Sequence, residues 1–385
     1  MRFSVDAHAI GRHLSGNEAY VRNLLQAFAA LDTGDEFIAY LSAGEAAGSV
    51  PSGFTCRPVS INPFVRLGVD LGQKLRLDRP DLIHVQYTAP LSCPVPVVVS
   101  VHDVSFLERP DFFTQPRAMQ LRYTVKRTVE RAARVLTLSE FSRAAILRAY
   151  NLDEQKVKVV PAAHSSVFRP TSREAAIAAV FEKFAIESPF LLSVGDLQPR
   201  KNQIGLIRAF EELVVHYPQL PHRLVLVGQD TWFSPRIREA AARSRVSERI
   251  HFTGYVGEDD LLYLYNACDA FIFPSYYEGF GIPLLEAMAC GRAVACSNTS
   301  AMPEVADAAA ILFDPHSTGE MVRAMRDLLL DAELRSRMER LGQQNAARFC
   351  WEQTARQTLA VYYEVAGAAS AVGADQGRAL PVARP

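Results

Sequence analysis

The sequence predicts two α/β domains, each a doubly wound, Rossmann-like parallel sheet, which face one another across a cleft. The chain has 385 residues, which is too long for one ordinary domain and suits two. Hydrophobic residues make up 49% of it and charged residues 22%, a balance that can fill two cores. Short β-branched runs alternate with amphipathic helical stretches in both halves. Strands that are apolar on both faces form parallel sheets covered by helices.

Short apolar runs are the predicted strands. In the first half they lie at residues 3–6, 37–41, 82–85, 97–101, 135–138 and 157–160. In the second half they lie at residues 190–194, 224–227, 250–252, 270–273, 293–296 and 311–313. Between them, apolar residues recur every three or four positions, as expected of helices with one buried face.

The domain boundary is predicted within residues 161–170, which hold two prolines and two serines. A new helix then begins with Thr171 and Glu174, spaced as a capping box. We therefore expect an N-terminal domain at 1–168 and a C-terminal domain at 169–366. Residues 367–385 are rich in Ala, Gly and Pro, and we expect a disordered tail there.

Charge and cysteine content exclude several classes of protein. Lys and Arg number 41 against 42 for Asp and Glu, so the chain lacks the basic excess of a nucleic-acid binder. The 6 cysteines include no CxxC pair, which favours reduced thiols over a zinc site or a disulfide framework. The sequence shows no signal-peptide core and no membrane-spanning apolar stretch, so we expect a cytoplasmic protein.

A glycine-containing loop follows the predicted strand 270–273 and leads into a helix. The loop reads Pro-Ser-Tyr-Tyr-Glu-Gly-Phe-Gly-Ile-Pro and carries Glu278, while Glu286 lies inside the helix. Backbone N–H groups of such a loop, together with the helix dipole, favour a diphosphate. Carboxylates accept hydrogen bonds from sugar or ribose hydroxyls.

Two basic residues follow the strand predicted at 190–194. Arg200 and Lys201 lie in Gly-Asp-Leu-Gln-Pro-Arg-Lys-Asn, residues 195–202. At the carboxyl edge of a sheet they would neutralise a leaving diphosphate, whose negative charge grows in the transition state.

Glu278 and Glu286, separated by seven residues in this setting, resemble the E-x7-E motif of retaining glycosyltransferases of family 4, which have the glycosyltransferase-B (GT-B) fold. The resemblance implies that Glu278 contacts the donor sugar and that Glu286 binds the ribose. It also implies that the N–H groups of Gly279, Phe280 and Gly281 hold the phosphate and sugar. By the same resemblance, the domain at 1–168 binds the acceptor and the domain at 169–366 binds the nucleotide-sugar donor.

The loop 195–202 resembles a pyrophosphate-gripping loop of the same family. Arg200 and Lys201 match its basic pair, whereas Asp196 stands where some members have an arginine. This form of the loop resembles the branch that contains many mannosyltransferases of surface polysaccharide assembly. The resemblance therefore favours GDP-mannose as the donor.

Three further positions match the family. Val256 stands where members pack main chain beside the nucleotide base. His102, directly after the strand 97–101, stands where members place a histidine near the donor sugar, and histidine donates to hydroxyls at neutral pH. Gly16 matches a glycine that faces the donor phosphate, although Glu18 replaces the usual second glycine.

Two other matches have structural interpretations. Ser139, in Ser-Glu-Phe-Ser at residues 139–142, is expected to be a helix N-cap. Glu304, in Pro-Glu-Val at residues 303–305, is expected to cap a helix.

A basic helix is predicted at residues 117–134. It carries Arg117, Arg122, Lys126, Arg127, Arg131 and Arg134 against one acidic residue, Glu130. Such a helix can rest on anionic lipid, as expected if the acceptor is a lipid-linked glycan. Peripheral contact with the inner face of the cytoplasmic membrane is therefore a hypothesis, and a solvated charged face is its alternative.

Together these features predict a retaining glycosyltransferase that moves a hexose from a nucleotide diphosphate sugar to a glycan or lipid-linked glycan. His102 and Glu278 are the expected catalytic residues. The sequence has no Asp-x-Asp-like pair, so we expect no metal and no other cofactor. A UDP-sugar-dependent enzyme and a non-catalytic sugar-nucleotide-binding partner are the alternatives. A dehydrogenase is disfavoured because no Gly-x-Gly-x-x-Gly turn follows the first strand.

Overall fold

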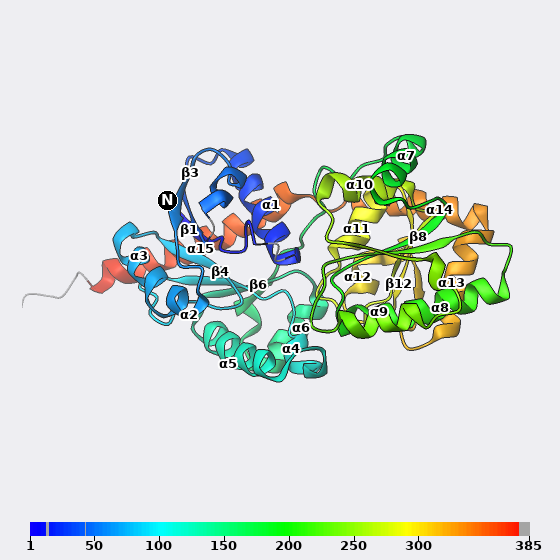
Figure 1. Cartoon of the computed structure of the whole chain (residues 1–385). Helices are drawn as coiled ribbons and strands as arrows, with labels where there is room; N and C mark the ends of the chain where they lie inside the picture. The colour runs from blue at the N-terminus through cyan, green and yellow to red at the C-terminus, as the bar shows by residue number, and fades with distance from the viewer. Residues whose placement is uncertain (13–14, 43, 377–385) are drawn as a thin grey trace, which may run out of the picture.

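The protein consists of two α/β domains, each built on one parallel sheet (Figure 1). The computed structural model describes residues 1–12, 15–42 and 44–376. The first sheet has the strand order β3-β2-β1-β4-β5-β6-β7, and the second has the order β10-β9-β8-β11-β12-β13. All strand pairs are parallel. The predicted fold class is confirmed.

Every strand predicted from the sequence is present, with ends shifted by at most two residues. The first sheet contains β1 (Arg2–Asp6), β2 (Glu36–Leu41), β3 (Phe54–Pro58), β4 (Leu82–Gln86), β5 (Val97–Ser100), β6 (Arg134–Thr137) and β7 (Val157–Val159). The second contains β8 (Phe190–Val194), β9 (Arg223–Val227), β10 (Ile250–Gly254), β11 (Ala270–Phe273), β12 (Ala293–Ser297) and β13 (Ile311–Phe313). Strand β3 is the one that the sequence analysis missed.

Helices cover both faces of each sheet. In the first domain, the helices are α1 (Ser15–Leu31), α2 (Pro63–Val65), α3 (Leu71–Asp78), α4 (Ser105–Glu108), α5 (Gln115–Arg131) and α6 (Glu140–Tyr150). Buried residues of α3, α5 and α6 share a core with β4, β5 and β6, while α1 packs on the opposite face. Apolar strands between two helical layers are the pattern that the sequence predicts.

The second domain repeats this arrangement. Its helices are α7 (Arg173–Phe184), α8 (Gln203–His216), α9 (Ser234–Ala242), α10 (Glu258–Ala267), α11 (Ile282–Ala289), α12 (Met302–Ala306), α13 (Thr318–Leu330) and α14 (Ala332–Ala346). Residues of α8, α9 and α13 form one core with the sheet, and residues of α7, α10 and α11 pack on its other face.

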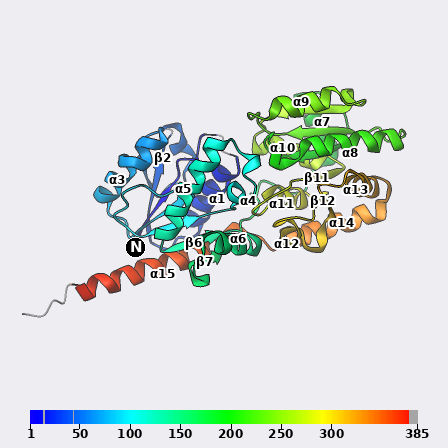
Figure 2. The same ribbon diagram turned by 90° about the horizontal axis from the view of Figure 1, so that it is seen from below.

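The last helix, α15 (Trp351–Gln376), returns to the first domain. The sequence analysis instead placed residues up to 366 in the second domain. In Figure 2 this red helix runs along the first domain. Its Tyr362 is buried against Phe3, and the Tyr362 hydroxyl lies 2.6 Å from Nδ1 of His84. The apolar face of α15 thereby covers sheet surface beside α1.

Three local predictions need correction. The α7 N-cap is Ser172, which accepts from the Ala175 N–H, and not Thr171. Helix α5 ends at Arg131, so Arg134 belongs to β6, where it pairs with Glu364 of α15. The predicted tail is helical as far as Gln376, and its remainder, 377–385, lies outside the described residues.

Within the described ranges, no helix combines the length and the apolar composition needed to cross a bilayer.

Candidate active site

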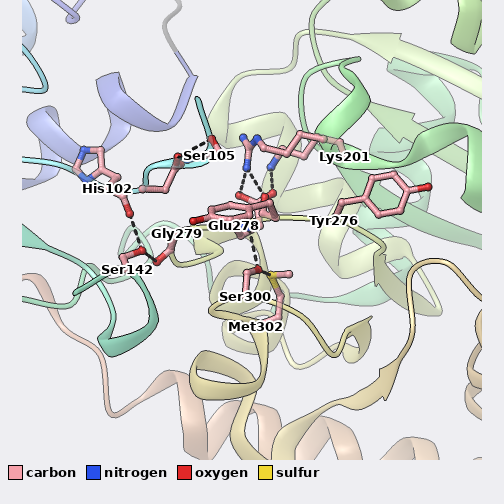
Figure 3. Close-up of polar contacts among 12 residues, drawn as sticks. His102, Ser105, Ser142, Lys201, Tyr276, Glu278, Gly279, Ser300 and Met302 are labelled. Carbon is pink, nitrogen blue, oxygen red and sulfur yellow. Dashed lines mark hydrogen bonds and ion pairs between the residues drawn. The ribbon is translucent and has the colours of Figure 1, made fainter. Parts of the chain in front are cut away.

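Three of the predicted site residues meet at one point of the second domain. The carboxylate of Glu278 accepts from Arg200 Nη1 at 2.5 Å through Oε2 and from Lys201 Nζ at 2.7 Å through Oε1. Figure 3 shows Lys201 reaching toward Glu278 at the centre of this group. The three side chains are largely buried, with exposed fractions of 16% for Arg200, 12% for Lys201 and 9% for Glu278. Their charges therefore interact with little screening by water.

The two cations control the ionisation of Glu278. Burial alone would raise the pKa of this carboxyl, but the charges of Arg200 and Lys201 outweigh burial and lower the pKa to about 2. Burial lowers the pKa of Lys201, although Glu278 opposes that shift. The group thus holds two positive charges and one negative charge at neutral pH, a net positive site that suits a diphosphate.

Backbone contacts hold the two predicted loops together. The Tyr276 N–H donates to the Arg200 carbonyl at 2.8 Å, and Arg200 Nη1 donates to the Tyr277 carbonyl at 2.8 Å. Gly195 gives Lys201 room, since a Cβ built there would lie 3.0 Å from Cε of Lys201. The loop after β8 and the loop after β11 therefore act as one unit at the carboxyl edge of the sheet.

Gly279, next to Glu278, touches the first domain. A Cβ built on Gly279 would lie 2.1 Å from the carbonyl oxygen of His102, so only glycine permits this approach. The predicted sites of the two domains are thus adjacent through backbone, although no hydrogen bond joins the His102 ring to Glu278 within the described residues.

The imidazole of His102 is buried with an exposed fraction of 9%, and neither ring nitrogen has a hydrogen-bond partner in the described part of the chain. Aromatic rings of Tyr20 and Tyr87 pack on it, with centroids at 4.6 and 5.6 Å. Burial lowers its pKa to about 4, against the opposing charge of Asp103. At neutral pH the ring is uncharged and offers one N–H donor and one acceptor nitrogen.

Glu286 lies on α11, apart from the ion-paired group. Its Oε2 accepts from the hydroxyl of Tyr265 at 2.8 Å. Burial raises the pKa of Glu286 to about 7, while the Tyr265 hydrogen bond opposes this shift and Glu258 adds to it. Tyr265 is a contact that the sequence analysis missed, because nothing in the motif points to a tyrosine on α10.

Within the described residues, the structure gives no contact between this group and two predicted donor-binding residues, Gly16 and Val256. Gly16 lies in the first turn of α1, exposed, with nothing within 4 Å of a Cβ built on it. Glu18, which replaces a glycine of the family, accepts from the Gly11 N–H at 2.9 Å. Val256 is half-buried in the loop after β10. The roles of Gly16 and Val256 stay predictions.

Across the described part of the chain, no three His, Cys, Asp or Glu side chains gather as a metal site would require.

Comparison with known protein families matches both halves of the chain. Residues 14–163 match the family described as Glycosyltransferase Family 4, and residues 178–345 match Glycosyl transferases group 1. The O-antigen chain mannosyltransferase B of Escherichia coli is 32% identical over 266 residues, which are 69% of this chain and 69% of that protein. The serotype-specific mannosyltransferase WbdA of Escherichia coli is 26% identical over 323 residues. These are 79% of this chain but 39% of that longer protein.

Solved structures share the fold at low identity. A sucrose-phosphate synthase from Thermosynechococcus elongatus superposes with a TM-score of 0.78 at 19% identity, covering 96% of this chain and 100% of that one. WaaG, a glycosyltransferase involved in lipopolysaccharide biosynthesis, has a TM-score of 0.73 at 19% identity, covering 93% and 98%. Each domain matches one of the two family descriptions, and the chain superposes on these structures over more than nine-tenths of its length. The chain belongs to glycosyltransferase family 4 and is a glycosyltransferase with the GT-B fold.

Proposed function

We propose that this enzyme transfers mannose from GDP-mannose, with retention of configuration, to a glycan or lipid-linked glycan during surface polysaccharide synthesis. The observation that carries the proposal is the buried group of Arg200, Lys201 and Glu278 beside the backbone of His102. A mannosyl donor is supported by the two Escherichia coli relatives, whose names describe mannosyltransferases. A UDP-sugar is the second candidate, because the structure of Anabaena HepE, 20% identical to this chain, was solved with UDP and glucose.

In the proposed reaction, the bond between the anomeric carbon and the diphosphate oxygen breaks while an acceptor oxygen bonds to the same face of that carbon. The acceptor proton passes to the departing phosphate oxygen. Arg200 and Lys201 stabilise the charge that grows on the diphosphate. Glu278 orients the donor sugar, and neutral His102 hydrogen-bonds a sugar hydroxyl from the facing domain.

The proposed chemistry uses no metal ion or other cofactor. The two cationic side chains carry the neutralising charge that a divalent cation supplies in other phosphoryl-leaving reactions. Glu286 would accept from the ribose hydroxyls, and the backbone N–H groups of Gly279–Gly281 would face the phosphate and the sugar.

Calorimetry with the full chain tests the donor. We expect GDP and GDP-mannose to bind and UDP, ADP, UDP-glucose and NAD to bind weakly or not at all. Glu286→Ala should weaken the binding, while Glu333→Ala, an exposed change on α14, should leave it unchanged. Selective binding of UDP would show that the donor is a UDP-sugar and not GDP-mannose. Binding of NAD alone would overturn the assignment of the site.

We also propose that the first domain rests on an anionic bilayer through α5 and the segment containing α2. Arg122, Lys126 and Arg131 on α5 are exposed. Large apolar side chains are exposed beside them: Ile61, Phe64, Val65, Val69, Leu91, Met119 and Tyr123. Leu91 joins the two parts, since its N–H donates to the Leu67 carbonyl and its carbonyl accepts from Arg127. Basic residues beside exposed apolar ones are typical of an interfacial surface.

Vesicle co-sedimentation checks this surface. Each basic residue near an anionic bilayer contributes about 1 kcal/mol, so changing Arg122, Lys126 and Arg131 to Gln should lower partitioning onto anionic vesicles on the order of a hundredfold. A matched triple change of Arg208, Arg236 and Arg243 in the second domain should leave partitioning unchanged. Equal partitioning of both triple variants, or of the wild type onto neutral and anionic vesicles, would contradict the proposal.

A further inference from the structure

The two family motifs without an assigned role contact each other across the junction of the domains. Ser139 is the N-cap of α6, as its sequence predicts, and its hydroxyl accepts from the Ser142 N–H. Glu304, on α12 of the second domain, caps the same helix. Its Oε1 accepts from the Glu140 N–H at 2.8 Å, and its Oε2 accepts from the Phe141 N–H at 3.1 Å. A carboxylate at a helix N-terminus is favoured by unpaired N–H groups and by the helix dipole.

The hydroxyls of the same turn hold the site backbone. Ser139 Oγ donates to the Gly279 carbonyl at 2.7 Å. Ser142 Oγ lies 2.9 Å from the His102 carbonyl and 3.1 Å from the Gly279 carbonyl, so its single proton is shared between residues of both domains. Figure 3 shows Ser142 between His102 and Gly279. Both serines are fully buried.

We propose that Ser139, Ser142 and Glu304 form a clamp that positions the donor loop at Glu278 and Gly279 against His102. They are positioning residues, and none of them contacts the reacting atoms. The inference rests on the proposed roles of His102 and Glu278.

The clamp requires the two domains to be together. The acceptors that it uses in the second domain are the Gly279 carbonyl and the Glu304 carboxylate, whereas their donors belong to the N-cap and first turn of α6 in the first domain. Separation of the domains would break all of these bonds at once. Gly279 also has no room to move toward the first domain, because a Cβ there would already overlap the His102 carbonyl. The clamp thus defines one relative position of the His102 ring and the Glu278 carboxylate.

Steady-state transfer and nucleotide binding, measured with the full chain, separate the clamp from the donor site. The variants are Ser142→Ala, Glu304→Ala and their combination. Arg200, Lys201 and Glu286, which are proposed to hold the nucleotide, lie in the second domain, so the dissociation constant for the nucleoside diphosphate should not change. The kcat for transfer should fall on the order of tenfold in the combined variant, since small misplacements of reacting groups are costly. Glu304→Gln, which keeps two polar atoms and loses the charge, should recover part of the loss.

Glu140→Ala is the matched control, because this exposed side chain lies in the same helical turn and contributes only its backbone N–H to the clamp. It should retain the wild-type kcat. An unchanged kcat in the combined variant overturns the clamp. A loss of kcat in Glu304→Ala that is fully accounted for by unfolded protein, as measured by thermal unfolding, also overturns it. If the wild-type chain binds no nucleoside diphosphate, the proposed donor site is overturned instead.

Discussion

Replacing Glu278 by Gln should lower kcat by about three orders of magnitude while leaving the affinity for the nucleoside diphosphate undiminished. The carboxylate now engages both Arg200 and Lys201, the cations assigned to the diphosphate. Removing its charge frees these cations for the leaving group, so binding of the diphosphate does not suffer. The sugar, by contrast, loses the charged acceptor that orients it against the facing domain.

The same substitution should destabilise the free protein. The neutral amide in Glu278→Gln would leave two buried cations without their counter-charge, and breaking a buried ion pair in this way costs about 3–5 kcal/mol. A saturating nucleoside diphosphate should restore part of the loss, because it binds only the folded site. Thermal unfolding with and without nucleotide, together with kcat and the dissociation constant, measures these effects.

Glu211→Gln is the matched control, since Glu211 pairs with Arg245 at 2.7 Å on the surface of the same domain. Exposed pairs contribute about 0–1 kcal/mol, so its stability and kcat should stay near those of the wild type. If Glu278→Gln keeps its kcat, Glu278 takes no part in transfer. If nucleotide affinity falls in parallel with kcat, Glu278 binds the nucleotide and does not orient the sugar.

The low pKa of Glu278 also determines the pH range in which its ion pairs stabilise the protein. Because the folded pKa is about 2, below the ordinary value near 4.5, the ion pairs stabilise the protein fully above pH 4.5. This contribution is lost as the pH falls from about 4.5 through 2. Glu278 therefore contributes no pH dependence to catalysis near neutrality.

The sheets were predictable because their strands are continuous apolar runs, whereas β3 was not. Residues Phe54–Pro58 form an edge strand that pairs only with β2 and is mostly open to solvent, so it has no apolar pattern. The return of α15 to the first domain was also not predictable from the sequence. Its apolar period predicts a buried face but does not specify which sheet that face covers. Contacts with the first domain, among them the packing of Tyr362 on Phe3 and His84 and the ion pair of Glu364 with Arg134, distinguish the two.

The site was predictable where one short motif carries both position and chemistry. Arg200, Lys201 and Glu278 each follow a strand whose carboxyl end reaches the same edge, and the structure places their side chains in contact. The partners that tune the site come from elsewhere in the chain. Tyr265 reaches Glu286 from α10, and Glu304 reaches a helix of the other domain. Sequence spacing contains no information about such contacts.

Affinity for GDP-mannose should increase on the order of thirtyfold between pH 5 and pH 8, with a midpoint near 7. Burial holds the pKa of Glu286 at about 7, so the carboxyl is largely protonated at pH 5 and charged at pH 8. Each ribose hydroxyl bonds a charged carboxylate about 1 kcal/mol more strongly than a neutral one, and two such bonds give this factor. GDP-mannose is the right probe because both of its phosphates are esterified and do not titrate in this range.

Ionisation of Glu286 has the opposite effect on the stability of the free protein, which falls as the pH rises. A carboxyl whose folded pKa is raised stabilises the fold at low pH, and this contribution is lost as the pH rises from about 4.5 through 7. Nucleotide binding thus favours the charged form of Glu286, which folding disfavours, and binding should release protons when measured near pH 6. Calorimetry in buffers of different ionisation enthalpy detects that release.

Two variants distinguish Glu286 from other titrating groups. Glu286→Gln should bind with a flat pH profile, since no charge then develops at this position. Tyr265→Phe keeps the buried ring but removes the hydroxyl that opposes the shift, so the midpoint should move to higher pH. A wild-type profile that persists unchanged in Glu286→Gln would mean that another group controls nucleotide affinity and that Glu286 does not meet the ribose.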